Sequence, residues 1–286
     1  MSSVPGPVAA YVAAQGWGRI ATATPVGGGC INDGARLTTT TGPALFLKFN
    51  ADAAPDMFQR EAEGLEALAS VEGGPSVPAP LLIGEEFILL EYLSPAAPAA
   101  DYWEAFGARL APLHAATNSR FGFPHDNYIG STPQTNRWES DGFRFFAEQR
   151  LLFQGRLARD RGLMRPPSLQ QLERLAERLR ELVPEQPASL LHGDLWSGNV
   201  IPGPGGHACL IDPAAHYGWA EAELAMTALF GRFPPAFYSA YESVRPLAPG
   251  YRARFDIYNL YHLLNHLNLF GGSYLGAVEG ILARYS

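Results

Sequence analysis

Short apolar stretches separated by glycine, proline and polar residues fill the first third of the chain. Such stretches predict strands, because four to eight β-branched, aromatic or leucine-type residues between turn residues suit a sheet. The predicted strands cover residues 19–26, 34–39, 44–49, 81–84 and 86–92. A short helix is predicted at 7–15, and the spacing of Met57, Phe58, Leu65 and Leu68 predicts a second, amphipathic helix after the third strand.

Beyond residue 100 the apolar residues recur with the period of a helix. This pattern predicts helices at 101–117, 139–161 and 168–183, from about 221, and at 251–270. Between 191 and 212 it predicts a strand, a polar loop and a hairpin whose tip is Pro202–Gly206. The change of pattern follows Ser94–Pro98, a proline- and alanine-rich segment typical of a hinge. We therefore predict an α+β protein with a β-rich part, residues 1–93, and a larger, mostly helical part, residues 94–286.

The composition narrows the classes of partner. Of the 286 residues, 47% are apolar and 17% are charged, which describes a globular chain with a sizeable core. The formal net charge of −7 argues against nucleic acid as a partner, and the chain has no lysine-rich patch for a membrane surface. We find no secretory leader and no apolar run of 18 residues. Two cysteines cannot form a disulfide framework, so we expect a cytoplasmic protein.

The candidate chemistry lies in Leu190–Asn199, where an acid and an amide follow an apolar run. Phosphoryl transfer from ATP uses such a pair: Asp194 as the base for the attacking hydroxyl, and Asn199 as a ligand of Mg²⁺. Asp212 follows thirteen residues after Asn199, where a kinase has its other Mg²⁺ ligand. Asp and Asn are also common turn residues, so this segment alone leaves a structural turn open.

Lysine use supports the kinase interpretation. Of the 21 Lys and Arg residues, 20 are Arg, and the one lysine is Lys48, at the end of a predicted strand. A lysine in this position contacts the phosphates of ATP in kinases, where the planar guanidinium of Arg is not equivalent to a compact ammonium. Glu61, on the following helix, is the candidate ion-pair partner of Lys48, and Glu63 is the competing one.

A glycine-rich segment precedes this strand and can bring backbone N–H groups close to phosphate oxygens. Its candidate nucleotide-binding residues are Gly28, Gly29, Cys30, Ile31 and Asn32. A plain hairpin turn is the alternative for this segment. The order of glycine loop, lysine, helix glutamate, Asp194 with Asn199, and Asp212 is that of protein kinases, which predicts a bilobal protein-kinase-like fold.

Two further residues, Gly193 and Trp196, indicate the class of acceptor. Gly193 stands where a protein kinase regulated by phosphorylation has an arginine, and no Ala-Pro-Glu segment follows Asp212, so a protein kinase is disfavoured. Trp196 offers a flat apolar face to a sugar ring and a cation–π partner to a protonated amine, although it could instead pack beneath the loop. His192 is expected to brace the loop rather than to titrate during catalysis.

Taken together, the segments resemble the fructosamine/ketosamine 3-kinases, a family related to the aminoglycoside phosphotransferases. The resemblance rests on the glycine loop, the Lys48 strand, Leu191–Asn199, Asp212–Ala214, Tyr217–Gly218, Glu223–Thr227, Leu229–Gly231, Phe121–Phe123, Asp126–Gly130 and Leu269–Tyr274. It implies ATP and Mg²⁺ as cofactors, adenine bound by backbone groups of Glu91 and Leu93, and Trp196, His266 and Asn268 in the substrate cleft. A buried, hydrogen-bonded His266 is the alternative.

The chain departs from the family pattern at two positions. Glu223 stands where the family has Asp, which bears on the packing beneath the catalytic loop. Gly142 stands where the family has Trp, which could alter one wall of the substrate cleft.

The activity that the resemblance implies is phosphorylation of ketosamines, free or protein-bound, at the 3-hydroxyl, which leads to deglycation. An aminoglycoside kinase and a nucleotide-binding pseudokinase are the alternatives, and intact Lys48, Asp194, Asn199 and Asp212 argue against the latter. Cys30 could link two chains through a redox-sensitive disulfide, or it could be an inert loop residue of a monomer. Cys209 is expected to be a buried small hydrophobe.

Overall fold

The computed structural model describes residues 4–27 and 32–285. Five antiparallel strands near the N-terminus form one sheet in the order β1-β2-β3-β5-β4. Their bounds are β1 Ile20–Val26, β2 Asp33–Thr39, β3 Leu45–Phe49, β4 Pro80–Ile83 and β5 Phe87–Glu91. They match the five predicted strands to within a few residues at each end.

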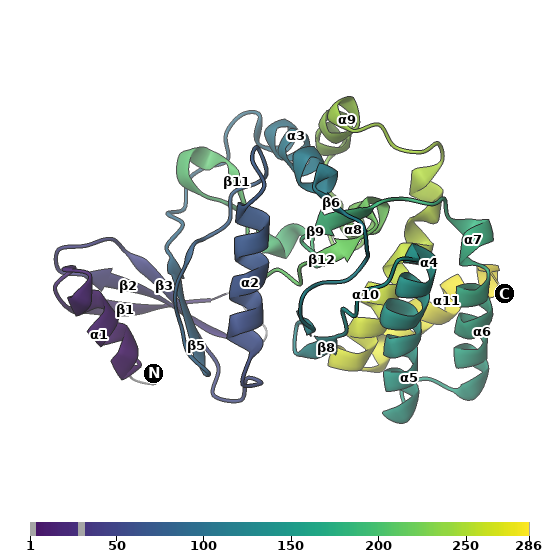
Figure 1. Ribbon diagram of the computed structural model, residues 1–286, viewed down its shortest axis with the longest axis horizontal. Coiled ribbons are helices and arrows are strands. Elements are labelled where there is room, and N and C mark those ends of the chain that lie inside the picture. The colour runs from purple at the N-terminus through teal and green to yellow at the C-terminus, as the bar shows by residue number, and fades with distance from the viewer. Residues whose placement is uncertain (1–3, 28–31, 286) are drawn as a thin grey trace.

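Helices cover both faces of this sheet (Figure 1). Alternate residues of a strand point to opposite faces, so Leu45 and Leu47 pack with helix α1, Gly6–Ala14, while Phe46 and Lys48 point to the other face. Helix α2, Met57–Ala69, packs on that second face through apolar side chains and separates the sheet from the helical part. The alternation therefore directs the lone lysine toward the helix that carries Glu61.

The remainder of the chain is mostly helical and contains the largest apolar core. Its main helices are α3 Tyr102–Ala115, α4 Gly142–Phe146, α5 Phe153–Asp160, α6 Pro166–Glu177, α7 Leu179–Leu182, α8 Ala220–Met226, α9 Pro235–Val244, α10 Phe255–Phe270 and α11 Leu275–Tyr285. Its short strands are β6 Thr117–Asn118, β7 Asn127–Ile129, β8 Thr132–Gln134, β9 Ala188–Leu191, β10 Val200–Pro202, β11 Ala208–Leu210 and β12 His216–Gly218. The predicted α+β class is therefore confirmed, whereas the division at residue 93 stays a prediction.

Several predictions of individual elements were wrong. The helix expected at 139–161 begins only at Gly142 and contains a π-helical turn, Ala147–Leu152. The β7–β8 hairpin and helices α9 and α11 were not predicted. The hairpin has no apolar alternation, because buried amide side chains such as Asn127 and Gln134 form its inner side. Periodicity cannot detect such an element.

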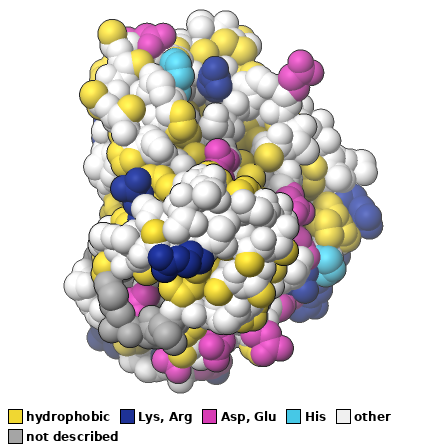
Figure 2. All heavy atoms as spheres, turned by 90° about the vertical axis from the view of Figure 1, so that its left-hand side faces the viewer, with side chains coloured by type: hydrophobic (Ala, Val, Ile, Leu, Met, Phe, Trp, Pro, Cys, Tyr) yellow, Lys and Arg dark blue, Asp and Glu magenta, His cyan; other side chains and the backbone are white. Residues whose placement is uncertain are grey.

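The surface agrees with the charge argument. Figure 2 shows that Lys and Arg side chains on the face of the N-terminal sheet stand as separate groups and form no continuous basic patch. Among the described residues, no helix has both the length and the apolar character needed to cross a membrane.

Candidate active site

One cleft of about 480 Å³ contains residues of both parts of the chain. Ten candidate site residues that the structure describes line it: Asn32, Lys48, Glu61, Glu91, Leu93, Asp194, Trp196, Asn199, Asp212 and His266. The other candidates, Gly28, Gly29, Cys30 and Ile31, lie outside the described residues. Residues separated by more than 200 positions in the sequence thus meet around one cavity.

Lys48 lies at the centre of this cleft and binds two carboxylates. Its Nζ donates to Glu61 at 2.8 and 3.0 Å and to Oδ1 of Asp212 at 2.6 Å. Burial alone would lower the pKa of Lys48, but the two carboxylates outweigh it and raise the pKa above its usual value. The ammonium therefore stays charged at neutral pH.

The competing glutamate has different partners. Glu63 accepts hydrogen bonds from Arg60 at 2.7 and 2.8 Å and from Nδ1 of His125 at 3.0 Å. Because Glu61 and Glu63 lie two residues apart on α2, they project from different sides of the helix. The ion pair with Lys48 thus belongs to Glu61, as the sequence favoured.

The loop that carries Asp194 follows β9 and is braced by His192. The buried imidazole donates from Nε2 to the carbonyl of Ile211 at 2.8 Å and accepts at Nδ1 from the amide of Asp194 at 3.3 Å. Burial lowers the pKa of His192, so the ring is neutral and can make both contacts at once. His192 has the geometry of a brace.

Gly193 occupies a position that accepts only glycine. Its φ is +87°, and a Cβ there would lie 2.0 Å from the carbonyl oxygen of Ala214. The amide of Ala214 in turn donates to the carbonyl of His192 at 2.9 Å. The loop before Asp194 and the loop after Asp212 are therefore in direct backbone contact, which leaves no room for the arginine of a regulated protein kinase.

Glu223, on α8, anchors the Asp194 loop from below. Its carboxylate accepts from the amides of Gly193 at 2.6 Å and His192 at 3.2 Å, and from Nε2 of His114 at 2.9 Å. Burial by itself would raise the pKa of Glu223, but the hydrogen bond and charge of His114 and the neighbouring donors hold it below the usual value. The longer side chain at this position thus still makes the contacts that the loop needs.

Asp194 projects from this loop into the cleft. Asn199 donates from Nδ2 to the carbonyl oxygen of Asp194 at 2.8 Å and to its Oδ2 at 3.0 Å. Burial raises the pKa of Asp194 to about 7, with smaller contributions from Asp212 and Glu223, against the lowering effect of Asn199. A carboxylate with such a pKa is matched to proton transfer near neutral pH.

The β10–β11 hairpin places Asn199 beside Asp212. Asn199 directly precedes β10, Asp212 follows β11 closely, and the amide of Ile211 donates to the carbonyl of Asn199 at 3.1 Å. Asp212 is in the left-handed region at φ +58°, which is rare for a residue with a Cβ. This conformation lies where the chain leaves β11 and turns toward Lys48, and such outliers concentrate at functional sites.

Trp196, His266 and Phe270 line the cleft beyond Asp194, and further aromatic rings pack behind them. Trp196 meets Phe230 edge to face at 6.4 Å between ring centroids, and Phe230 lies 4.5 Å from the ring of His266. Phe270 and Tyr274 lie 5.4 and 5.2 Å from the same imidazole. Trp196 also covers Gly198, whose Cβ would come within 2.4 Å of the indole. Trp196 therefore both packs on the loop and lines the cleft.

His266 likewise combines the two roles that the sequence left open. Its Nδ1 donates to the carbonyl of His262 at 2.9 Å, which leaves the lone pair of a neutral ring on Nε2, and the residue lines the cleft. The expectation for Asn268 was wrong, because its amide donates to Gln154 inside the helical part. Gly142 packs against Phe121 and Trp219 and does not line this cleft.

Sequence reasoning missed five polar residues that line the cleft, namely Arg60, Tyr92, Asn127, Tyr128 and Asn265. Arg60 precedes Glu61 on α2, so the helical period that selected Glu61 could have indicated its neighbour as well. Asn127 and Tyr128 lie in a segment that carried the family resemblance but to which no role was assigned. For Asn265 the sequence holds no comparable signal.

The donor set suits Mg²⁺ better than a transition metal. No group of three or more His, Cys, Asp or Glu residues in the described part of the chain is arranged to hold a metal ion. The candidate ligands are one carboxylate, Asp212, and one amide, Asn199. Mg²⁺ commonly takes only one or two protein ligands and completes its shell with phosphate oxygens and water.

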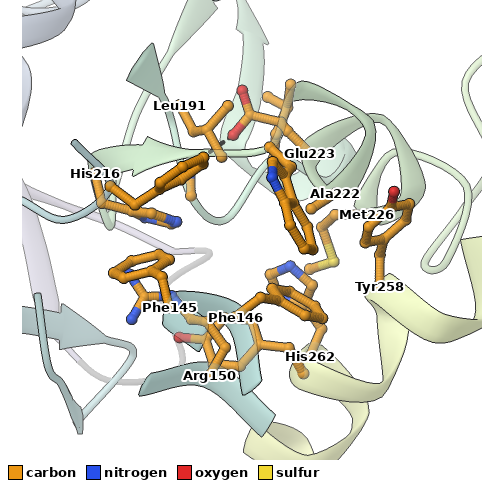
Figure 3. Close-up of a pocket in the computed structure, with 16 residues that line it drawn as sticks. Phe145, Phe146, Arg150, Leu191, His216, Ala222, Glu223, Met226, Tyr258 and His262 are labelled. Carbon is orange, nitrogen blue, oxygen red and sulfur yellow. Dashed lines mark hydrogen bonds between the residues drawn. The ribbon is translucent and has the colours of Figure 1, made fainter. Parts of the chain in front are cut away.

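A second, much smaller cavity of about 20 Å³ lies beneath the Asp194 loop and is lined mainly by aromatic side chains. Figure 3 shows His216 and His262 projecting toward it from opposite sides, with Phe145 and Phe146 around them. Its volume matches one water molecule, so it cannot hold a substrate.

Comparisons of sequence agree with this geometry. The model of a family described as fructosamine kinase matches residues 9–286. A probable ketoamine kinase of Synechocystis sp. is 44% identical over 271 residues, which cover 93% of this chain and 90% of that protein. A chloroplastic protein-ribulosamine 3-kinase of Arabidopsis thaliana is 39% identical over 269 residues, covering 91% of this chain and 81% of that protein.

Solved structures identify the fold as well. A crystal structure from Thermobifida fusca YX-ER1, of a protein to which fructosamine-3-kinase activity is ascribed, superposes with a TM-score of 0.89 at 35% identity and 98% coverage of both chains. An ADP-bound aminoglycoside phosphotransferase shares the fold alone, with a TM-score of 0.65 at 14% identity and coverage of 98% and 97%. The fold is that of the protein-kinase-like phosphotransferases, as predicted, and the chain belongs to the fructosamine kinase family.

Proposed function

We propose that this protein transfers the γ-phosphoryl group of ATP to the 3-hydroxyl of a ketosamine. The observation that carries the proposal is the meeting of Lys48, Asp194, Asn199 and Asp212 in one cleft whose next wall is aromatic. The first four residues are the parts that phosphoryl transfer requires. The aromatic wall suits a sugar bearing an amine.

ATP would lie between the sheet and the Asp194 loop. Lys48, held by Glu61, would contact its phosphates, while Asn32 and the glycine-rich segment before it would cover them. The amide of Glu91 already donates to the carbonyl of Ala79, so Glu91 would contact adenine through its carbonyl oxygen and Leu93 through its amide. We propose residue 93 as the end of the nucleotide-binding part.

Asn199 and Asp212 would hold Mg²⁺ against the phosphates. Asn199 uses its Nδ2 on Asp194, which leaves Oδ1 for a cation, and Asp212 uses Oδ1 on Lys48, which leaves Oδ2. Mg²⁺ neutralises the charge that develops on the transferring phosphate.

Asp194 would act as the general base. Its carboxylate takes the proton of the 3-hydroxyl while the oxygen attacks the γ-phosphorus, the bond to the β-phosphate oxygen breaks, and ADP leaves. Asn199 orients the carboxylate through Oδ2, and Glu223 fixes the loop beneath it. A positioned base of this kind contributes about 10²–10⁴-fold to the rate.

The aromatic wall would bind the acceptor. The face of Trp196 suits the sugar or the carbon that bears the amine, and a protonated amine gains cation–π stabilisation there. The Nε2 lone pair of His266 can accept a hydrogen bond from a hydroxyl or an ammonium.

The product explains why such a reaction would repair an amine. A phosphate on C3 lies next to the C2 carbonyl and is a far better leaving group than hydroxide. Enolisation between C1 and C2 then expels inorganic phosphate from C3, and hydrolysis releases the free amine and a dicarbonyl sugar. Phosphorylation would therefore lead to deglycation.

The charge distribution disfavours an aminoglycoside as the acceptor. The described acidic residues that line the cleft are Glu61, Glu91, Asp194 and Asp212, which all belong to the nucleotide site or the transfer site. The wall beyond Trp196 is neutral and aromatic, whereas a polycationic aminoglycoside calls for several carboxylates. A pseudokinase is disfavoured because Lys48 keeps both of its carboxylate partners.

The decisive experiment measures ADP release with ketosamines of different sugar length (fructosamine, ribulosamine and erythrulosamine) in parallel with kanamycin. We expect turnover with at least one ketosamine, a product with phosphate on C3 by ³¹P NMR, subsequent release of the amine, and none of these with Asp194→Asn. Turnover with kanamycin alone, or ADP release that no acceptor stimulates, would refute the proposal.

A further inference from the structure

Helix α2 is the element on which the Lys48–Glu61 contact depends. Glu61 reaches Lys48 only while the helix keeps its rotation and its distance from β3. Phe58 and Leu65 pack α2 onto the sheet, but apolar contacts of this kind allow a helix to shift. Regulated protein kinases control this helix through phosphorylation of a downstream segment, and the close contact at Gly193 excludes the arginine that such control uses.

A polar network joins α2 to the segment before and within β7. The Oη of Tyr128 donates to Oδ1 of Asp56 at 2.6 Å, at the N-terminal end of the helix. Nδ1 of His125 donates to Glu63 at 3.0 Å, about two turns farther along the helix. Arg60 connects the two acids, through Nε to Asp56 at 3.0 Å and through Nη1 to Glu63 at 2.7 Å. We call these five residues the α2 latch.

The same hairpin also supports the loop after Asp212. The buried amide of Asn127 donates to the carbonyl of Ala215 at 2.9 Å, and that of Gln134 to the carbonyl of Ala214 at 3.1 Å. Asn136 donates to Oδ1 of Asn127 at 2.8 Å and ties the hairpin to the irregular segment that follows β8. One hairpin thus contacts both α2 and the loop after Asp212, the two elements that supply the carboxylate partners of Lys48.

We propose that Tyr128 and Asp56 are positioning residues, which hold α2 so that Glu61 meets Lys48 before nucleotide binds. The inference rests on the proposed function, because it assigns Lys48 to ATP. Of the two latch contacts that join α2 to the β7 segment, the Tyr128–Asp56 bond is the shorter, and it joins a hydroxyl to a carboxylate. Consistent with this contact, Tyr128 lowers the pKa of Asp56, and burial and Asp56 raise the pKa of Tyr128 to about 12.

Two substitutions test the latch from its two ends. Tyr128→Phe removes only the hydroxyl and keeps the ring in the cleft wall, while Asp56→Asn changes the partner, which does not line the cleft. Because Asp56 is half exposed, we expect each variant to lower kcat/KM for ATP by about 5- to 20-fold, with the KM for ketosamine unchanged. The double variant should have the same kcat/KM for ATP as Asp56→Asn alone, because both substitutions break the same hydrogen bond.

Tyr11→Phe is the matched control, because Tyr11 lies on α1, away from the cleft, and should behave as wild type. The latch would be overturned if the losses in kcat/KM for ATP of the two single variants added up in the double variant, or if Asp56→Asn had the kcat/KM of the wild type. A raised KM for ketosamine in Tyr128→Phe would also overturn it, and would place Tyr128 in direct contact with the substrate. If Tyr128→Phe does not fold, the kcat/KM for ATP of Asp56→Asn alone decides whether the latch positions Glu61. Calorimetric binding of MgADP gives a readout without acceptor, so the latch can be judged even if no ketosamine is phosphorylated.

Discussion

Replacing Glu223 by Gln should destabilise the protein and disable the Asp194 loop. The carboxylate accepts three hydrogen bonds, from His114, His192 and Gly193. A glutamine of the same shape has one acceptor oxygen, and its NH₂ group would face an N–H donor. At least one buried donor then loses its partner, which costs about 1–3 kcal/mol. Loss of the buried carboxylate charge beside His114 adds to this cost, so we expect Glu223→Gln to lower the free energy of unfolding by about 2–4 kcal/mol in total.

Urea unfolding at pH 8, 6, 5 and 4 measures this difference, and ADP release measures turnover. In thermal unfolding at pH 8, the melting temperature should fall by about 5–10 °C, and turnover should fall as well because the base lies on the loosened loop. The folded-state pKa of Glu223 is below the ordinary 4.5, so its contribution is complete above that pH and is lost as the pH falls through the folded-state value. The difference in the free energy of unfolding between the wild type and Glu223→Gln should therefore stay constant from pH 8 to 5 and become smaller below pH 4.5.

Glu66→Gln is the matched control. Glu66 is exposed on α2, and the same chemical change there should alter the free energy of unfolding by less than about 0.5 kcal/mol. If Glu223→Gln is as stable as this control, or if the gap does not depend on pH, then Glu223 does not anchor the loop as an ionised carboxylate.

Four further outcomes are expected. Asp194→Asn should keep ATP affinity and lose about 10²–10⁴-fold in turnover; a loss below tenfold would assign the base elsewhere. Lys48→Arg should be severely impaired in ATP turnover, because a planar fork cannot replace an ammonium held between Glu61 and Asp212; a normal rate would contradict this. Cys30, which lies outside the described residues, is predicted to make the enzyme sensitive to peroxide, so peroxide should lower the activity and a reductant should restore it. Equal inhibition of the wild type and of Cys30→Ala would refute this role of Cys30. Buried Cys209 should not respond. Finally, peptide mass spectrometry after incubation with ribose should show no adduct on Lys48, because this only lysine is buried and charged, whereas Arg156→Lys should gain an adduct at position 156.

The sequence by itself predicted the residues to which we assign fixed chemical roles, and the structure brings them into one cleft. Lys48, Asp194, Asn199 and Asp212 could be found because phosphoryl transfer tolerates few residue types and keeps them in a fixed order. The five strands of the sheet and α2 could be found because each buries one face, and burial leaves a period of 2 or 3.6 in the sequence.

The tertiary structure alone decided which groups surround these residues. The β7–β8 hairpin is stabilised by buried amide contacts of Asn127 and Gln134 with backbone carbonyls more than 70 residues away, and such contacts leave no periodic trace. For Glu223 the family pattern indicated a place beneath the catalytic loop, but only the structure shows its partners, which are His114 and the loop amides. The local pattern of apolar residues indicates which face of a helix or strand is buried. Only the tertiary structure shows which distant polar groups meet at that face, because those contacts depend on three-dimensional proximity and not on spacing in the sequence.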